Sequence, residues 1–159
     1  SGGGQVAIEH EAISVDHLEQ ITKTEIKLLA SSKTIPVGLP GCSFYLGIPY
    51  APGRELMERG LPFALASDFN PGSSPVYDMQ KIWSLGCIKM KLSPQQALDA
   101  ITCNGAMAMD AGEEVGSVQV GLRANLVVLQ QGVQNLSYVP YAFGENNIEK
   151  VMISGEWVA

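Results

Sequence analysis

Short apolar runs alternate with segments of helical spacing over the first two thirds of the sequence, and this alternation is the strongest constraint on the fold. The run at residues 62–67 is almost continuously apolar, which is typical of a strand buried on both faces of a helix-covered parallel sheet. The pattern predicts strands over 12–18, 34–40 and 62–67 and helices over 22–33, 52–60 and 79–91. A strand followed by a helix, repeated, is the βα unit, so we expect an α/β fold.

Capping signals support the helices of this pattern. Thr22 or Thr24 stands at the start of the first helical segment. Ser93 precedes a further one, with Pro94 at its first position and Gln96 placed for a capping box. These signals predict where the two helices begin.

The character of the sequence changes near Gly112. Residues 116–130 are β-like with glycine turns, and residues 148–159 read as two short β segments around Ser154 and Gly155. We therefore predict two parts, residues 1–111 with the βα units and residues 112–159 with a smaller β-rich unit.

The composition excludes several classes of protein. A hydrophobic fraction of 46% is that of a globular chain. The net charge of −6, without a basic stripe, argues against nucleic acid and against an anionic membrane as partners. No apolar run approaches the roughly 20 residues of a membrane-spanning helix, and three distant cysteines without a CxxC pair favour a reducing compartment. We expect a cytoplasmic protein.

The stretch ALASDFNPGSSP, residues 64–75, joins the third expected strand to a loop of turn residues through Asp68. Sites in parallel α/β folds are built at the carboxyl ends of strands, where a carboxylate can bind a metal ion and accept a proton from water. Asn70, Gly72 and Ser73 then offer an amide, a close-approach backbone and a hydroxyl. The alternative is that Asp68 only caps the turn. The residues alone leave both open.

His17 is the second candidate, because it stands at the end of the first expected strand, directly after Asp16. The alternative is a core histidine bonded to a backbone carbonyl. His10 lies in a polar stretch, where a solvated side chain is expected. The sequence contains no G-x-S-x-G elbow, GxGxxG fingerprint or phosphate-binding P-loop.

Four segments, ISVDHLE, LPGCSFYLG, ALASDFNPGSSP and GLRANLVVL, together resemble the imidazolonepropionases, metal-dependent amidohydrolases of histidine breakdown. The resemblance covers nearly the whole chain, and DFNPGSSP is its most specific part. It implies the C-terminal part of a (β/α)8 amidohydrolase barrel plus part of a small β-sandwich. It also implies a reaction, the hydrolysis of the ring C–N bond of 4-imidazolone-5-propanoate to give N-formimino-L-glutamate.

The resemblance assigns roles to individual residues. Asp68 matches a ligand of one divalent metal ion, zinc or iron, and would hold or receive the proton of the attacking water. His17 matches an active-site histidine that stabilises developing charge. Asn70, Gly72 and Ser73 match residues that touch the small-molecule substrate or product.

Departures from the family pattern suggest an incomplete site. The family's His-x-His pair, a further metal-binding histidine, and the arginine and tyrosine that grip the propionate have no counterpart here, and Asn125 replaces an aspartate. We therefore expect an inactive fragment that forms a homo-oligomer or lacks an N-terminal segment. The alternatives are another cyclic amidohydrolase or deaminase, and a non-catalytic α/β module.

Overall fold

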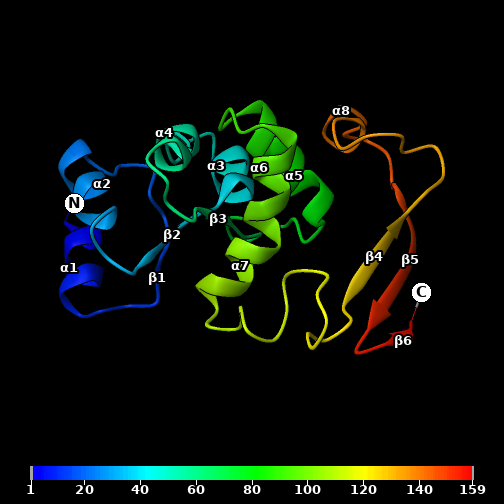
Figure 1. The fold of residues 1–159 in the computed structure, drawn as a ribbon. Helices are drawn as coiled ribbons and strands as arrows, with labels where there is room; N and C mark the ends of the chain where they lie inside the picture. Colours follow the sequence, from blue (N-terminus) through cyan, green and yellow to red (C-terminus); the bar gives the residue numbers. More distant parts are fainter. Residues whose placement is uncertain (1, 159) are drawn as a thin grey trace.

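The structure, a computed structural model, describes residues 2–158 and contains a three-stranded parallel sheet (Figure 1). Its strands are β1 (Ser14–Val15), β2 (Ile35–Gly38) and β3 (Ala64–Leu65), in the order β1-β2-β3. Ser14 pairs with Ile35, and Val37 pairs with Ala64. All three predicted strands are present, although each is shorter than its apolar run.

Helices connect and flank these strands. They are α1 (Gly3–Glu9), α2 (Lys23–Leu29), α3 (Pro40–Leu46), α4 (Gly53–Glu58), α5 (Met79–Ile88), α6 (Pro94–Ile101), α7 (Cys103–Ala108) and α8 (Tyr138–Tyr141). Capping boxes at Thr22 and at Ser93 begin α2 and α6, which confirms both helix starts predicted from the sequence. The apolar pattern missed α1, α3 and α8. In α3, Pro40 occupies the first turn directly after β2, where the sequence predicted the last residue of a strand.

Hydrophobic side chains cover both faces of the parallel sheet. Leu65 and Phe63 belong to the larger core cluster, packed with Trp83 of α5 and with further residues of α2, α4 and α6. Val37 and Ala64 belong to a smaller cluster on the opposite face. This two-sided burial is the physical reason for the continuous apolar run at 62–67.

A second, antiparallel sheet lies on the other side of the molecule (Figure 1). Its strands are β4 (Leu126–Leu129), β5 (Ile148–Ile153) and β6 (Glu156–Trp157), in the order β4-β5-β6. Ser154 and Gly155 have φ angles of 52° and 89°, and such a left-handed pair suits a two-residue hairpin. The predicted pair of β segments around these residues is confirmed. Within residues 112–158 the structure describes this one sheet, so the expected part of a β-sandwich is not shown by it.

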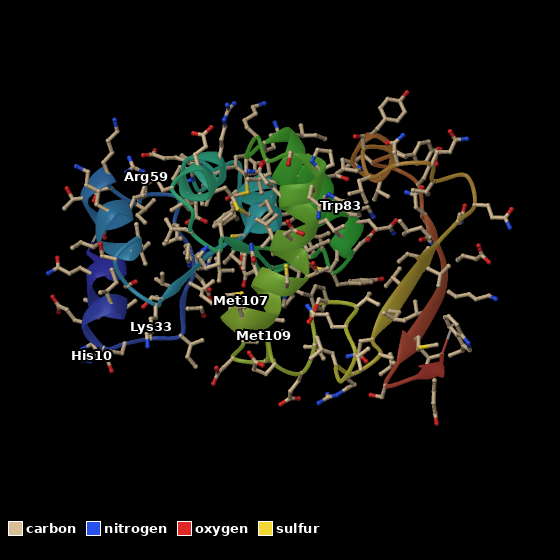
Figure 2. The ribbon with its side chains drawn as sticks, viewed as in Figure 1. His10, Lys33, Arg59, Trp83, Met107 and Met109 are labelled. Carbon is tan, nitrogen blue, oxygen red and sulfur yellow. The ribbon has the colours of Figure 1, made fainter. Side chains whose placement is uncertain are left out.

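Among residues 2–158, no helix has the length and apolar character needed to cross a membrane. His10 follows the last residue of α1 and is exposed to solvent, far from the antiparallel sheet (Figure 2). The surface position predicted for this histidine is therefore confirmed.

Candidate active site at the carboxyl edge of the parallel sheet

The carboxyl ends of β1, β2 and β3 meet at one edge of the sheet because the strands are parallel. Asp16 and His17 follow β1, Cys42 lies in the first turn of α3 after β2, and Asp68 follows β3. The sheet thus brings together the two main residues predicted from the sequence, from the ends of its first and third strands.

His17 and Asp68 share an unusual backbone conformation. Their φ angles are 57° and 49°, in the left-handed region that residues other than glycine seldom adopt. Such conformations cost free energy and cluster at functional sites, where the surrounding structure enforces them. The turn at each residue ends the extended chain and sets the direction in which the side chain leaves the sheet edge.

The pKa of the Asp16 carboxyl group is affected by the charges at this edge of the sheet. Asp16 is exposed by surface area, yet the protein atoms around it partly desolvate its carboxyl. This desolvation raises the pKa of Asp16, the nearby His17 lowers it, and the negative charge of Asp68 raises it further. The ends of β1 and β3 are therefore close enough for their charges to interact.

Cys42 lies near Asp68, Ser73 and Glu19 at this edge of the sheet. Its side chain is buried, and this burial raises the pKa of the thiol. A hydrogen bond from Ser73 opposes the shift, whereas the charges of Asp68 and Glu19 raise the pKa further. Cys42 is therefore a neutral thiol at neutral pH, without the thiolate character that a nucleophile needs. The sequence analysis did not single out this thiol as a residue of the site.

The loop after Asp68 is organised by the side chain of Asn70. Its amide nitrogen donates to the Asp68 carbonyl at 2.7 Å, and its Oδ1 accepts from the backbone N–H groups of Gly72 at 2.9 Å and Ser73 at 2.8 Å. The Ser73 hydroxyl also donates to Oδ1, at 3.1 Å. Fully buried Ser74 donates to the Ser67 carbonyl at 2.6 Å. Asn70, rather than Asp68, supplies the side-chain bonds that close the turn.

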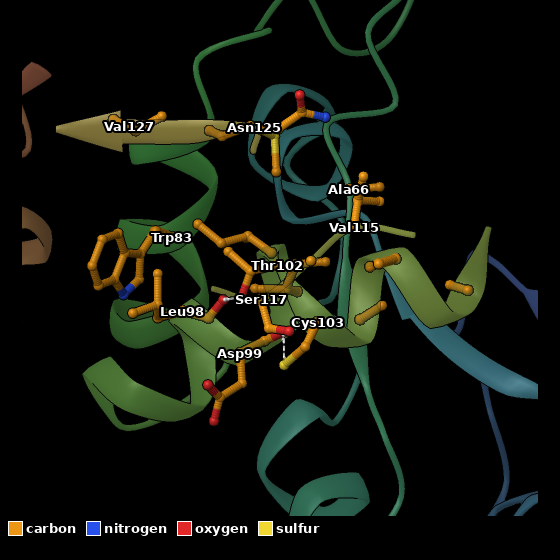
Figure 3. A pocket seen from close by; sticks show the side chains of 18 of the residues that line it. Ala66, Trp83, Leu98, Asp99, Thr102, Cys103, Val115, Ser117, Asn125 and Val127 are labelled. Carbon is orange, nitrogen blue, oxygen red and sulfur yellow. Dashed lines mark hydrogen bonds between the residues drawn. The ribbon is translucent and has the colours of Figure 1, made fainter. Parts of the chain in front are cut away.

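A cavity of about 1060 Å³ lies between the two sheets, and neither His17 nor Asp68 lines it (Figure 3). Apolar side chains such as Ala66, Trp83 and Val127 dominate its lining. It reaches the carboxyl edge of the parallel sheet through Asp16, Ala66 and Ser67. The lining also includes polar side chains such as Asp78, Asp99 and Cys103, whereas His17 and Asp68 lie outside it.

At the sheet edge, Asp68 offers a side chain of the kind that binds a divalent metal ion. Asp68 is only partly buried and offers a carboxylate oxygen, the kind of ligand that zinc and iron accept. Residues 2–158 bring together no group of three histidine, cysteine, aspartate or glutamate side chains that could hold a metal ion. Asp68 therefore fits the role of one ligand, and this part of the chain does not form a complete metal centre.

Comparison with curated proteins shows which relatives share this sequence. The chain is 47% identical to the imidazolonepropionase of Christiangramia forsetii over 157 residues, which cover 99% of this chain and 38% of the relative. It is 42% identical to the imidazolonepropionase of Alkaliphilus oremlandii over 158 residues, or 99% and 37% of the two chains. The chain thus spans a little over a third of the length of these relatives.

Solved structures give the same fold. A zinc-bound adenosine deaminase from Xanthomonas campestris superimposes with a TM-score of 0.82 at 27% identity, over 91% of this chain and 36% of that one. An Escherichia coli guanine deaminase gives 0.75 at 17% identity, over 92% and 38%. These likenesses confirm the α/β part of the fold prediction.

The family model described as "Amidohydrolase family" matches residues 8–158, almost the entire chain. Together with the imidazolonepropionase relatives, this match confirms the resemblance predicted from the four sequence motifs. The chain therefore belongs to the amidohydrolase family.

Proposed function

We propose that this chain is part of an imidazolonepropionase, which hydrolyses the ring C–N bond of 4-imidazolone-5-propanoate to give N-formimino-L-glutamate in histidine degradation. The observation that carries the proposal is that Asp68 and His17, both with left-handed backbones, follow strands of the parallel sheet at the same carboxyl edge. The similarity to imidazolonepropionases along the whole chain supports this choice of substrate.

Asp68 would be one ligand of a single divalent metal ion, zinc or iron, in the complete protein. When bound, such an ion supplies an activated water as the nucleophile. The side-chain carboxylate of Asp68 at the sheet edge can accept, at one of its Oδ atoms, the proton that this water loses. The other metal ligands and the group that binds the propionate would come from outside residues 2–158, from more of the same protein or from a second copy.

His17 would donate a hydrogen bond to the ring atom on which negative charge develops during the attack. Its side chain is 55% exposed, so a substrate can reach it from solvent. Ser73 and the backbone of Gly72 would contact the substrate from the loop after β3. Asn70 would hold that loop in shape, since its amide already bonds to both residues.

The test is the Asp68→Asn substitution in the complete protein. The amide is nearly the size of the carboxylate but has no charge and does not accept the proton from water. We expect turnover of 4-imidazolone-5-propanoate to fall at least about a hundredfold, the usual scale of general acid–base catalysis. Asp110→Asn is the matched control, because Asp110 is exposed and also has a positive φ, of 56°. Near-normal turnover by Asp68→Asn would contradict the proposal.

A ring deaminase is the second candidate, favoured by the adenosine deaminase structure at 27% identity. The products separate the two functions. Deamination releases ammonia and leaves the ring closed, whereas the proposed reaction opens the ring and releases none. Ammonia release from an aminated ring such as adenine, without turnover of imidazolonepropanoate, would favour the deaminase.

A further inference from the structure

Glu19, two residues after His17, carries a carboxylate oxygen whose burial has no explanation in the fold. The Glu19 side chain is only 10% exposed. Its Oε1 atom is shielded from solvent and has no hydrogen-bond partner among residues 2–158. A buried polar atom without a partner destabilises the fold, and more so if it is charged. Such an atom is expected to have a donor in the working state of the protein.

The imidazole of His17 lies next to this oxygen. His17 Nδ1 lies 3.6 Å from Glu19 Oε1, within ion-pair range but longer than a hydrogen bond. The His17 side chain is more than half exposed, so a small rotation of the ring can shorten this distance. Hydrogen bonds of active sites are often long in the absence of substrate and tighten when it binds.

Glu19 also lies near Cys42, which follows the neighbouring strand β2. Its charge acts on the buried thiol of Cys42, which in turn lies beside Asp68 and Ser73. The carboxylate of Glu19 is thus largely buried on the Nδ1 side of His17, whose own side chain is more than half exposed. This arrangement puts a fixed acceptor behind the histidine and leaves the opposite ring nitrogen free to face a substrate.

We propose that Glu19 is a positioning residue for His17, whose buried Oε1 accepts a hydrogen bond from Nδ1–H and thereby presents Nε2 to the substrate. The inference deepens the proposed function and rests on it for the role of His17. A histidine works in catalysis only if the correct nitrogen carries the proton, and the partner of the other nitrogen decides which one does. A merely structural Glu19 would not determine the proton position on His17.

The first measurement needs no catalytic activity. Nitrogen-15 NMR of the two histidines, His10 and His17, reports which ring nitrogen carries the proton when the rings are neutral. We expect the Nδ1–H form to predominate in His17 of the unchanged protein and the Nε2–H form in Glu19→Ala. Glu19→Gln keeps an oxygen acceptor and should retain much of the original distribution. Exposed His10 is the internal reference and should not change.

The second measurement is steady-state kinetics with imidazolonepropanoate in the complete protein. We expect kcat of Glu19→Ala to fall about ten- to a hundredfold, the effect of one lost charge-assisted hydrogen bond, with little change in KM. Glu19→Gln should recover part of the loss. Glu149→Gln, on the exposed face of β5, is the matched control and should leave both constants unchanged.

The two measurements separate this inference from the proposed function. An unchanged His17 proton distribution in Glu19→Ala, with the circular dichroism spectrum of the native fold, would overturn the positioning role. If Glu19→Ala does not fold, an Nε2–H majority at His17 in the native protein would overturn it instead. A shifted distribution in a protein that never turns over imidazolonepropanoate would uphold the positioning role and refute the proposed function.

Discussion

The loop after β3 should lose its shape when Asn70 is replaced by alanine. The substitution removes four hydrogen bonds, one to the Asp68 carbonyl and three accepted by Oδ1 from Gly72 and Ser73. A protein hydrogen bond contributes about 0.5–1.5 kcal/mol net. The bond from Gly72 is exposed, so water can replace it, and the other three are partly buried. We therefore expect a loss of about 2–3 kcal/mol.

Thermal unfolding followed by circular dichroism measures this loss. For a chain of this size, each kcal/mol lowers Tm by about 2–4 °C, so Asn70→Ala should lower Tm by about 4–12 °C. Asn135→Ala is the matched control, because the Asn135 side chain accepts a single exposed hydrogen bond, from Ser137 at 3.0 Å. Its effect should stay below about 1 kcal/mol.

Hydrogen exchange locates the effect within the molecule. The amides of Gly72 and Ser73 should exchange faster in Asn70→Ala, since both donate to the Asn70 side chain in the native loop. Equal Tm values for Asn70→Ala and Asn135→Ala, with unchanged protection of Gly72 and Ser73, would refute the claim that Asn70 organises this loop.

Three other outcomes are expected. A Cβ at Gly38 would lie 2.5 Å from Cζ of fully buried Phe63, so Gly38→Ala should lower the free energy of unfolding, measured with denaturant, by about 1–3 kcal/mol. A Cβ at Gly144 would have no atom within 4 Å, so Gly144→Ala should lower it far less. Equal losses of stability in the two variants would contradict this reasoning. Burial raises the pKa of Cys87 to about 11, so between about pH 9 and 11 the thiol ionises in the unfolded chain before it does so in the folded protein, and the free energy of unfolding falls. Cys87→Ala should show a weaker fall over this pH range. An identical pH dependence in Cys87→Ala would exclude the Cys87 thiol as the origin of the fall. Elemental analysis after dialysis should find less than one zinc or iron per chain in residues 1–159 alone, because residues 2–158 form no three-ligand group; stoichiometric metal in a monomer would overturn this expectation.

Local chemistry made several features of this protein predictable from its sequence. The capping boxes at Thr22 and Ser93 join residues three apart, and the hairpin at Ser154 and Gly155 depends on two backbone conformations. The alternation of apolar runs predicted the βα pattern, because burial on both faces of a strand requires apolar side chains in succession. Asp68 could be singled out because a carboxylate directly after such a strand is unusual.

The tertiary structure decided how the site is assembled. Cys42 joined Glu19 and Asp68 only because the parallel register of three strands brings separate loops to one edge. The rule that sites form at the carboxyl ends of such strands could have pointed to Cys42 after β2, but no local pattern shows which side chains meet there. The tight approach of Phe63 to Gly38 has the same origin. Such contacts join residues far apart in the sequence, and their geometry follows from packing, which local sequence patterns do not encode.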